Sequence, residues 1–203
     1  MAPDRTLNSI RIGFALTGSF CTFDTALLCL EDLVKAKADV TGIISNAADE
    51  TDTRFMTAAA LKNSIASITG KPVIRAVKDA EPIGPGKLLD LLLVLPATGN
   101  TLAKIANGIT DTPVTMAVKA HLRNNLPVVL AVSTNDALGN NAKNIGLLLN
   151  MKNIFFVPLG QDDPANKPKS MVFMKDKVIA AIEAALEGRQ VQPLLCAYFL
   201  QST

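Results

Sequence analysis

Short apolar runs recur along this chain, and each is followed by a polar or glycine-containing loop and then by a stretch with helical spacing. Runs without a polar face that alternate with helices are typical of a parallel β-sheet covered by helices on both sides. We therefore expect one α/β domain, a Rossmann-like or flavodoxin-like three-layer fold with a six-stranded parallel sheet. The predicted strands cover residues 10–16, 40–45, 73–76, 91–95, 128–133 and 154–157, of which 73–76 is the weakest.

The apolar spacing also predicts a helix after each of several strands. Leu27, Leu30 and Leu33 fall on one face of the first helix. Asp52 or Thr53 is the expected cap of the second, because side chains of these types accept hydrogen bonds from helix N–H groups. The predicted helices cover about 23–37, 53–69, 101–107, 113–124, 140–149 and 175–186.

The domain is expected to span residues 10–188, between an N-terminal tail of residues 1–9 and a C-terminal tail of residues 189–203. Gly188 fits the end of the last helix. Residues 194–200 are apolar, so we expect this part of the tail to dock on a neighbouring molecule.

The composition excludes several classes of protein. A net charge of +2 and an aromatic content of eight Phe, one Tyr and no Trp disfavour nucleic acid as a partner. No apolar stretch approaches the ~20 residues of a membrane span, and no signal peptide is seen, so we expect a cytoplasmic protein without a membrane partner. Three Cys and one His without metal-site spacing predict no metal. A hydrophobic content of 49% with only 19% charged residues favours a homo-oligomer.

Small polar residues follow four of the predicted strands, at the edge where parallel sheets bind ligands. Hydroxyls, amides and backbone N–H groups suit a phosphate and a polyol chain, and a helix N-terminus stabilises the phosphate. The first loop has one Gly rather than GxGxxG, which favours a mononucleotide over a dinucleotide. The alternative for each loop is a plain turn or helix cap. The candidate cofactor-binding residues are Thr17, Gly18, Ser19, Ser45, Ala97, Thr98, Asn100, Thr101, Ser133, Thr134 and Asn135.

Two of these segments resemble a known family. Residues 96–111, PATGNTLAKIANGITD, resemble the PASANTxAKxAxGxAD segment of the FMN-binding flavoproteins, which include phosphopantothenoylcysteine decarboxylases and peptidyl-cysteine decarboxylases. Residues 126–135, LPVVLAVSTN, are similar to that family's LPVVxAPAMN, with Ser133 and Thr134 in place of Ala and Met. The resemblance implies FMN as the cofactor.

A wider set of motifs, including TGSFCTF, TDTRF, EPIGP and STND, is similar to one branch of the family, the B subunits of dipicolinate synthases. This similarity covers roughly residues 10–195. It implies a protein that acts with a nicotinamide-binding A subunit, which carries NADP, to oxidise dihydrodipicolinate to dipicolinate. It also implies the mother-cell cytoplasm of a spore-forming bacterium.

Two alternative functions stay open. We assign no catalytic residue under any of the three hypotheses. The decarboxylases of the family carry a catalytic His just before the fourth strand, whereas residues 81–89 contain none and the one His of this chain is His121. An FMN-dependent decarboxylase is therefore the second hypothesis. A non-catalytic nucleotide-binding partner protein is the third.

A dicarboxylate substrate requires cations beside the cofactor, preferably the bidentate guanidinium of Arg. Arg54 is the first candidate, because it follows the second strand near a helix start, where positive charge gains nothing from the helix dipole. Lys104 and Lys119 are weaker candidates. The alternative for each is a solvated surface cation.

Overall fold

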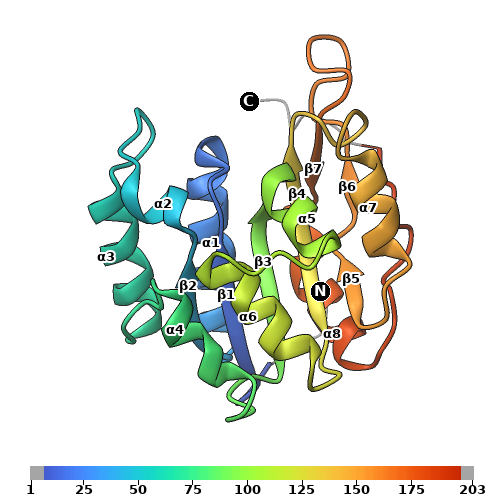
Figure 1. The fold of residues 1–203 in the computed structure, drawn as a ribbon. Coiled ribbons are helices and arrows are strands. Elements are labelled where there is room, and N and C mark those ends of the chain that lie inside the picture. Colours follow the sequence, from blue (N-terminus) through green and yellow to red (C-terminus); the bar gives the residue numbers. More distant parts are fainter. Residues whose placement is uncertain (1–6, 198–203) are drawn as a thin grey trace.

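The computed structural model describes residues 7–197, and these form an α/β fold around one mostly parallel sheet (Figure 1). Within them the sheet has seven strands in the order β2-β1-β3-β4-β7-β6, with β5 also paired to β4. The pairs among β1 to β5 are parallel, and β7 is antiparallel to both β4 and β6. The strands are β1 (Arg11–Leu16), β2 (Asp39–Ile44), β3 (Leu91–Ala97), β4 (Val128–Thr134), β5 (Ile154–Phe156), β6 (Leu159–Gly160) and β7 (Met171–Phe173).

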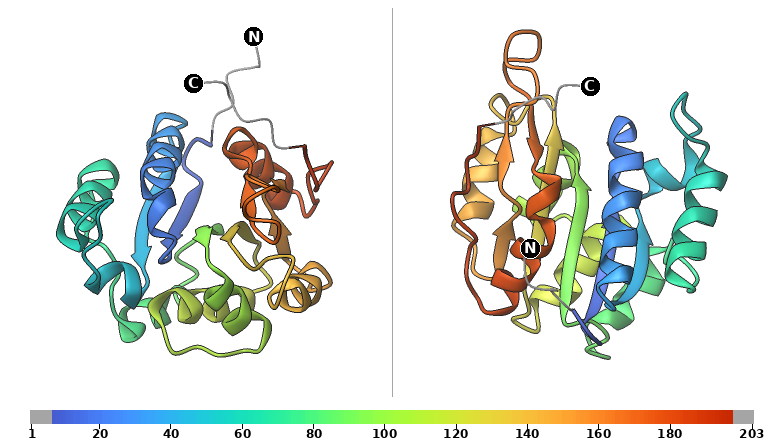
Figure 2. Two further views of the ribbon diagram at one scale, coloured as in Figure 1. Left: turned by 90° about the horizontal axis from the view of Figure 1, so that it is seen from above. Right: turned by 180° about the vertical axis from the view of Figure 1, so that it is seen from behind.

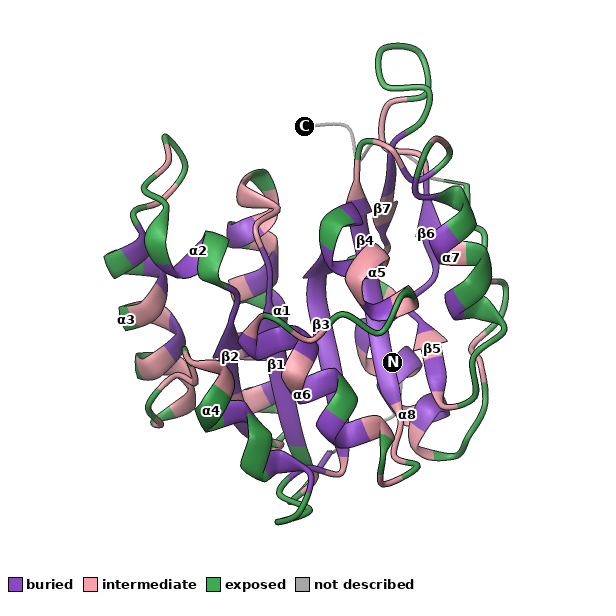
Figure 3. Ribbon diagram, in the orientation of Figure 1, coloured by how far each residue is buried: buried purple, intermediate pink, exposed green. Residues whose placement is uncertain are grey.

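The helices cover both faces of the sheet, so the fold has three layers (Figure 2). One core cluster packs α1, α3 and α8 against the sheet, and a second packs α4 to α7 on the opposite side. The strand β3 lies between them and is buried along its whole length (Figure 3). The helices are α1 (Phe23–Lys35), α2 (Asn46–Glu50), α3 (Ala58–Thr69), α4 (Val77–Ala80), α5 (Gly99–Ala106), α6 (Pro113–Leu122), α7 (Ala142–Leu149) and α8 (Val178–Leu186). Short 3-10 turns, η1 (Phe20–Thr22), η2 (Glu81–Ile83) and η3 (Lys175–Lys177), precede α1, follow α4 and precede α8.

The three-layer fold class is confirmed, but the prediction of six parallel strands is wrong in two respects. Residues 73–76 form a single bridge, between Ile74 and Ile43, because Arg75 pairs with Asp49 and α4 begins at Val77. The antiparallel strands β6 and β7 were not expected. They have two and three residues, too few to show an alternating pattern.

The helix predicted over residues 53–69 is α3, and its start differs from the prediction. Its N-cap is Thr57, whose side chain accepts a hydrogen bond from the Ala60 N–H, so α3 begins later than expected. Asp52 nevertheless contacts this helix, since its carboxylate accepts from the Ala58 N–H at 2.8 Å. The last helix ends as expected, because Gly188 follows it with a left-handed φ of 71°.

The described part of the C-terminal tail packs on its own chain. Leu159 of β6 donates its N–H to the Leu194 carbonyl at 2.9 Å and accepts from the Cys196 N–H at 3.0 Å. The tail segment expected to dock on a neighbour extends to residue 200, and its residues 198–200 lie outside the described part. Among residues 7–197, no helix has the length and apolar character needed to cross a membrane.

Candidate functional site

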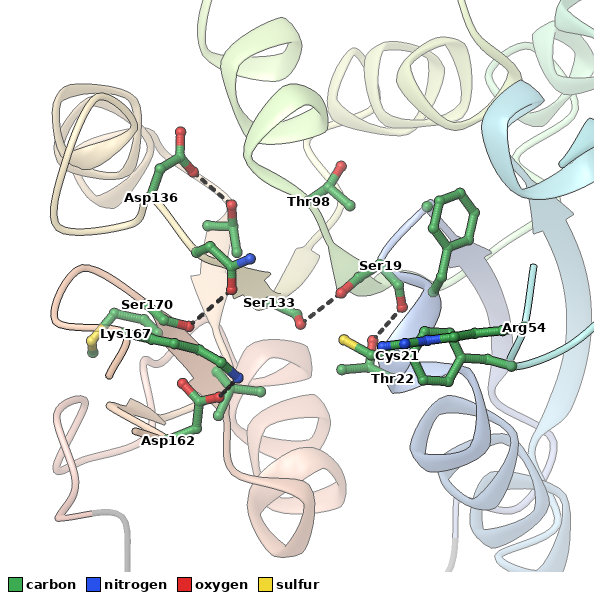
Figure 4. Close-up of a pocket in the computed structure, with 17 residues that line it drawn as sticks. Ser19, Cys21, Thr22, Arg54, Thr98, Ser133, Asp136, Asp162, Lys167 and Ser170 are labelled. Carbon is green, nitrogen blue, oxygen red and sulfur yellow. Dashed lines mark hydrogen bonds and ion pairs between the residues drawn. The ribbon is translucent and has the colours of Figure 1, made fainter. Parts of the chain in front are cut away.

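A cavity of about 630 Å³ opens at the carboxyl edge of the sheet (Figure 4). Its walls come from the loop after β1, the ends of β3 and β4, the loop between α2 and α3, and the segment from β6 to β7. The lining residues are Gly18, Ser19, Phe20, Cys21, Thr22, Arg54, Phe55, Thr98, Ser133, Thr134, Asn135, Asp136, Asp162, Lys167, Ser170, Met171 and Val172.

The predicted cofactor residues fall into two groups in the structure, and their contact with a cofactor stays a prediction. The cavity brings together Gly18, Ser19, Thr98, Ser133, Thr134 and Asn135. The other five do not line it. Thr17, Ala97 and Thr101 are buried, Ser45 caps α2, and Asn100 is exposed in the first turn of α5.

Hydroxyl groups hold the loop after β1 against the ends of β3 and β4. Thr17 Oγ1 donates to the Pro96 carbonyl at 2.6 Å and accepts from the Thr98 N–H at 3.1 Å. The Ser19 and Ser133 hydroxyls are 2.9 Å apart, which joins the β1 loop to the end of β4. The Ser19 N–H donates to the Thr17 carbonyl, so its hydroxyl, rather than its amide, is the group this residue presents to the cavity.

Asp136 anchors the end of β4, and the sequence interpretation missed it. Its Oδ1 accepts from the Thr134 hydroxyl at 2.6 Å and its Oδ2 from the Asn141 amide at 2.7 Å. Asn144 extends this chain of bonds inward, donating to Asn141 Oδ1 at 2.8 Å. A β carbon at Gly99 would lie 2.5–2.8 Å from polar atoms of this network, so the small residue lets α5 pack against it.

The segment between β6 and β7 supplies the wall that no sequence pattern predicted. Asp162 Oδ2 lies 3.4 Å from Lys167 Nζ, and the Asp162 Oδ1 atom is buried without a hydrogen-bond partner among the described residues. Ser170 Oγ lies 3.5 Å from Asn135 Oδ1, at the outer limit of a hydrogen bond to the end of β4. Asp162 belongs to an Asp-Asp-Pro turn motif, which by itself indicates nothing beyond a turn.

The predicted substrate cations are placed differently from one another. Arg54 lines the cavity, with its guanidinium carbon 4.8 Å from the centre of the Phe55 ring. Lys104 lies outside the cavity and forms an ion pair with Asp111 at 2.8 Å. Lys119 is exposed on α6 and also lies outside it.

His121 does not belong to the cavity. It is fully buried at the end of α6, and this burial lowers its pKa to about 4, so the imidazole is neutral at pH 7. Among the described residues, the lining of the cavity therefore contains no His.

A mostly parallel three-layer fold with a hydroxyl-lined cavity at its carboxyl edge is the architecture of nucleotide- and flavin-binding proteins. The family model described as Flavoprotein matches residues 1–187, and the chain belongs to this family, as the sequence resemblance indicated.

Within the family, the chain is 47% identical over 190 residues to the B subunit of dipicolinate synthase from Bacillus subtilis (strain 168), covering 94% of this chain and 95% of that protein. The crystal structure of the dipicolinate synthase B subunit from Bacillus halodurans C has 44% identity and a TM-score of 0.88, over 96% of this chain and 100% of that one. The FMN-dependent cysteine decarboxylase SpaF shares the fold, with 22% identity and a TM-score of 0.66, over 90% of this chain and 98% of that one.

Proposed function

We propose that this chain binds FMN in the cavity at the carboxyl edge of the sheet. The observation that carries the proposal is the lining itself, in which Gly18, Ser19 and Ser133 present small polar groups from the ends of β1 and β4, the two strands on either side of β3. Hydroxyls and amides are the groups that hold a phosphate and a ribityl chain. FMN, when bound, supplies an isoalloxazine ring that can take up or release electrons. The membership of the Flavoprotein family supports this cofactor.

We further propose that the chain is the B subunit of a dipicolinate synthase. The 47% identity to such a protein over nearly the whole of both chains supports this assignment. The reaction oxidises dihydrodipicolinate to dipicolinate: a ring hydride passes to NADP on the partner, the A subunit, and a ring proton is lost to a base. Arg54 binds a substrate carboxylate in this proposal, since it is the predicted cation that lines the cavity. Decarboxylation is not favoured, because His121 lies outside the cavity.

The proposal includes a homo-oligomer in the cytoplasm of a sporulating cell. Large apolar side chains are exposed on and near α7, with Leu138, Leu147 and Leu149 each about half exposed. Apolar surface of this kind is stabilised when it is buried against another molecule. Copies of this chain are the proposed partner at that surface.

The test is a reconstituted assay with the A subunit, NADP and dihydrodipicolinate. Arg54→Met keeps an apolar stem and removes the guanidinium. Hydrogen bonds to charged groups contribute roughly 1.5–3 kcal/mol, so this variant should raise the KM for the dicarboxylate at least about tenfold while its FMN content stays at the wild-type level. Lys119→Met is the matched control, because Lys119 is exposed outside the cavity, and it should behave as wild type.

Two results would contradict the proposal. Wild-type kinetics in Arg54→Met would show that Arg54 is a surface cation that does not bind the substrate. Full dipicolinate formation by the A subunit in the absence of this chain would remove its assignment as a component of the enzyme.

A further inference from the structure

Two walls of the cavity carry cations, and these come from segments far apart in the chain. Arg54 lies between α2 and α3, and Lys167 lies between β6 and β7. They are the only Arg and Lys among the described residues that line the cavity. In Figure 4 their nitrogen atoms point from opposite sides toward the space between the walls. A ligand in that space therefore meets positive charge at both ends.

The carboxylates that line the cavity leave these charges available. Asp136 accepts hydrogen bonds on both oxygens, from Thr134 and Asn141, so it is fully engaged in the wall of the cavity. Asp162 approaches the Lys167 ammonium through one oxygen, at 3.4 Å. This distance exceeds the 2.7–2.9 Å typical of a tight charge-assisted bond, and an ammonium has three donors. Lys167 can therefore stay beside Asp162 and still donate to a ligand.

Arg54 is free to bind a ligand in a different way. None of the described side chains forms an ion pair with it, and its contact is with the half-exposed ring of Phe55 at 4.8 Å. A cation held over an aromatic face keeps its edge N–H groups unoccupied. These N–H groups match the two oxygens of one carboxylate.

We propose that Lys167 is a specificity-determining residue that binds one carboxylate of a planar dicarboxylate while Arg54 binds the other. Asp162 is a positioning residue, because it holds the ammonium on its side of the cavity. This inference rests on the proposed function, which supplies a ring dicarboxylate as substrate. The phosphate of FMN is also a dianion that the same cations could bind, so the test must distinguish the two.

The experiment compares two ring ligands by isothermal titration of the flavin-reconstituted protein. Dipicolinate has two carboxylates and picolinate has one, on the same pyridine ring. The wild type should bind dipicolinate more tightly, and Lys167→Met should lower this preference at least about tenfold, the loss of one charged contact. Lys167→Arg should restore part of the preference. Lys169→Met is the matched control, since Lys169 is an exposed cation of the same segment that does not line the cavity.

FMN content, measured by absorbance in every variant, separates the possible sources of the anion. The inference predicts unchanged FMN content in Lys167→Met. Loss of FMN with an unchanged preference for dipicolinate would assign Lys167 to the phosphate and overturn the inference, while flavin binding itself would stand. A wild type without preference for dipicolinate would also overturn it. If the wild type takes up no FMN, the same titration is made with the protein as purified, and a preference for dipicolinate there would support the paired cations and contradict the proposed cofactor.

Discussion

The polar groups at the two edges of the sheet differ in their surroundings: at the amino edge they pair with one another, and at the carboxyl edge they line a cavity. At the amino edge, Asp90 accepts hydrogen bonds from the Arg11 backbone N–H at 2.8 Å and from the Arg11 guanidinium. Asp90 also interacts electrostatically with the buried His121. At the carboxyl edge, Ser19 and Ser133 bond to each other but still line an open cavity. Polar groups that satisfy one another stabilise the fold, whereas those that face a cavity remain available to a ligand. Substitutions at the two edges should therefore separate stability from binding.

The largest effect on stability is expected from Gly99→Val, because at the carboxyl edge Gly99 of α5 packs closely against the polar side chains around Asp136. The new side chain would enter the polar network around Asp136, adding overpacking of about 1–3 kcal/mol to a broken buried hydrogen bond of about 1–3 kcal/mol. We expect a loss of unfolding free energy of roughly 2–6 kcal/mol in urea denaturation, together with a loss of FMN binding. In the control, Gly146→Ala on α7, the added methyl meets nothing within 4 Å and should stabilise the helix by about 0.5–1 kcal/mol. A stable Gly99→Val would contradict this account of the network.

The second effect concerns pH and belongs to the amino edge. Burial lowers the pKa of His121 from 6.5 to about 4, so between these values the unfolded chain binds a proton that the folded chain does not. Stability should therefore fall as the pH drops from 6.5 to 4, by up to about 3 kcal/mol. His121→Phe should remove this dependence in urea denaturation at about pH 7 and about pH 4.5. Parallel losses in the wild type and the variant would show that His121 is not the group responsible.

The smallest effect is expected from Asp90→Asn, also at the amino edge. The guanidinium of Arg11 lowers the pKa of Asp90 below its usual 3.8, so the pair stabilises the fold above this value and the contribution is lost as the pH falls through the folded pKa. Because both side chains are partly exposed, the variant should lose no more than about 1 kcal/mol at pH 7. Its FMN content should equal that of the wild type. Reduced FMN content would mean that the two edges are coupled.

Part of the cavity at the carboxyl edge could be predicted from the sequence alone. Residues 17–19 and 133–135 each follow an apolar run, and the ends of parallel strands meet at one edge, so the Ser19 and Ser133 wall of the cavity could be predicted from local patterns. Arg54 could be proposed from its position after β2. Its place in the cavity depends on the late start of α3 at Ala58, which the Thr57 cap fixes, and the sequence offered Asp52 and Thr53 as competing caps of the same residue types.

The opposite wall could not be predicted, because long-range pairing alone positions it. Asp162 and Lys167 reach the cavity through β6 and β7, whose two and three residues show no alternation in the sequence. Residues 73–76 illustrate the reverse case. A short apolar run there predicted a strand, but it forms only the bridge between Ile74 and Ile43. Arg75 pairs with Asp49 instead of extending the strand, and α4 begins two residues later, at Val77.

The most direct test of the account is an FMN titration of the purified apoprotein, followed by flavin fluorescence, in the wild type and in Gly18→Val. A β carbon at Gly18 would lie 3.3 Å from Ala47 and 3.6 Å from the ring of Phe20. The two further methyl groups of Val would add bulk at this position, which lines the cavity. We expect saturable FMN binding by the wild type and an affinity at least about tenfold weaker in Gly18→Val, with unchanged circular dichroism and urea denaturation. A wild type that takes up no FMN, or a Gly18→Val variant that binds it with wild-type affinity, would contradict the assignment of this cavity to the flavin.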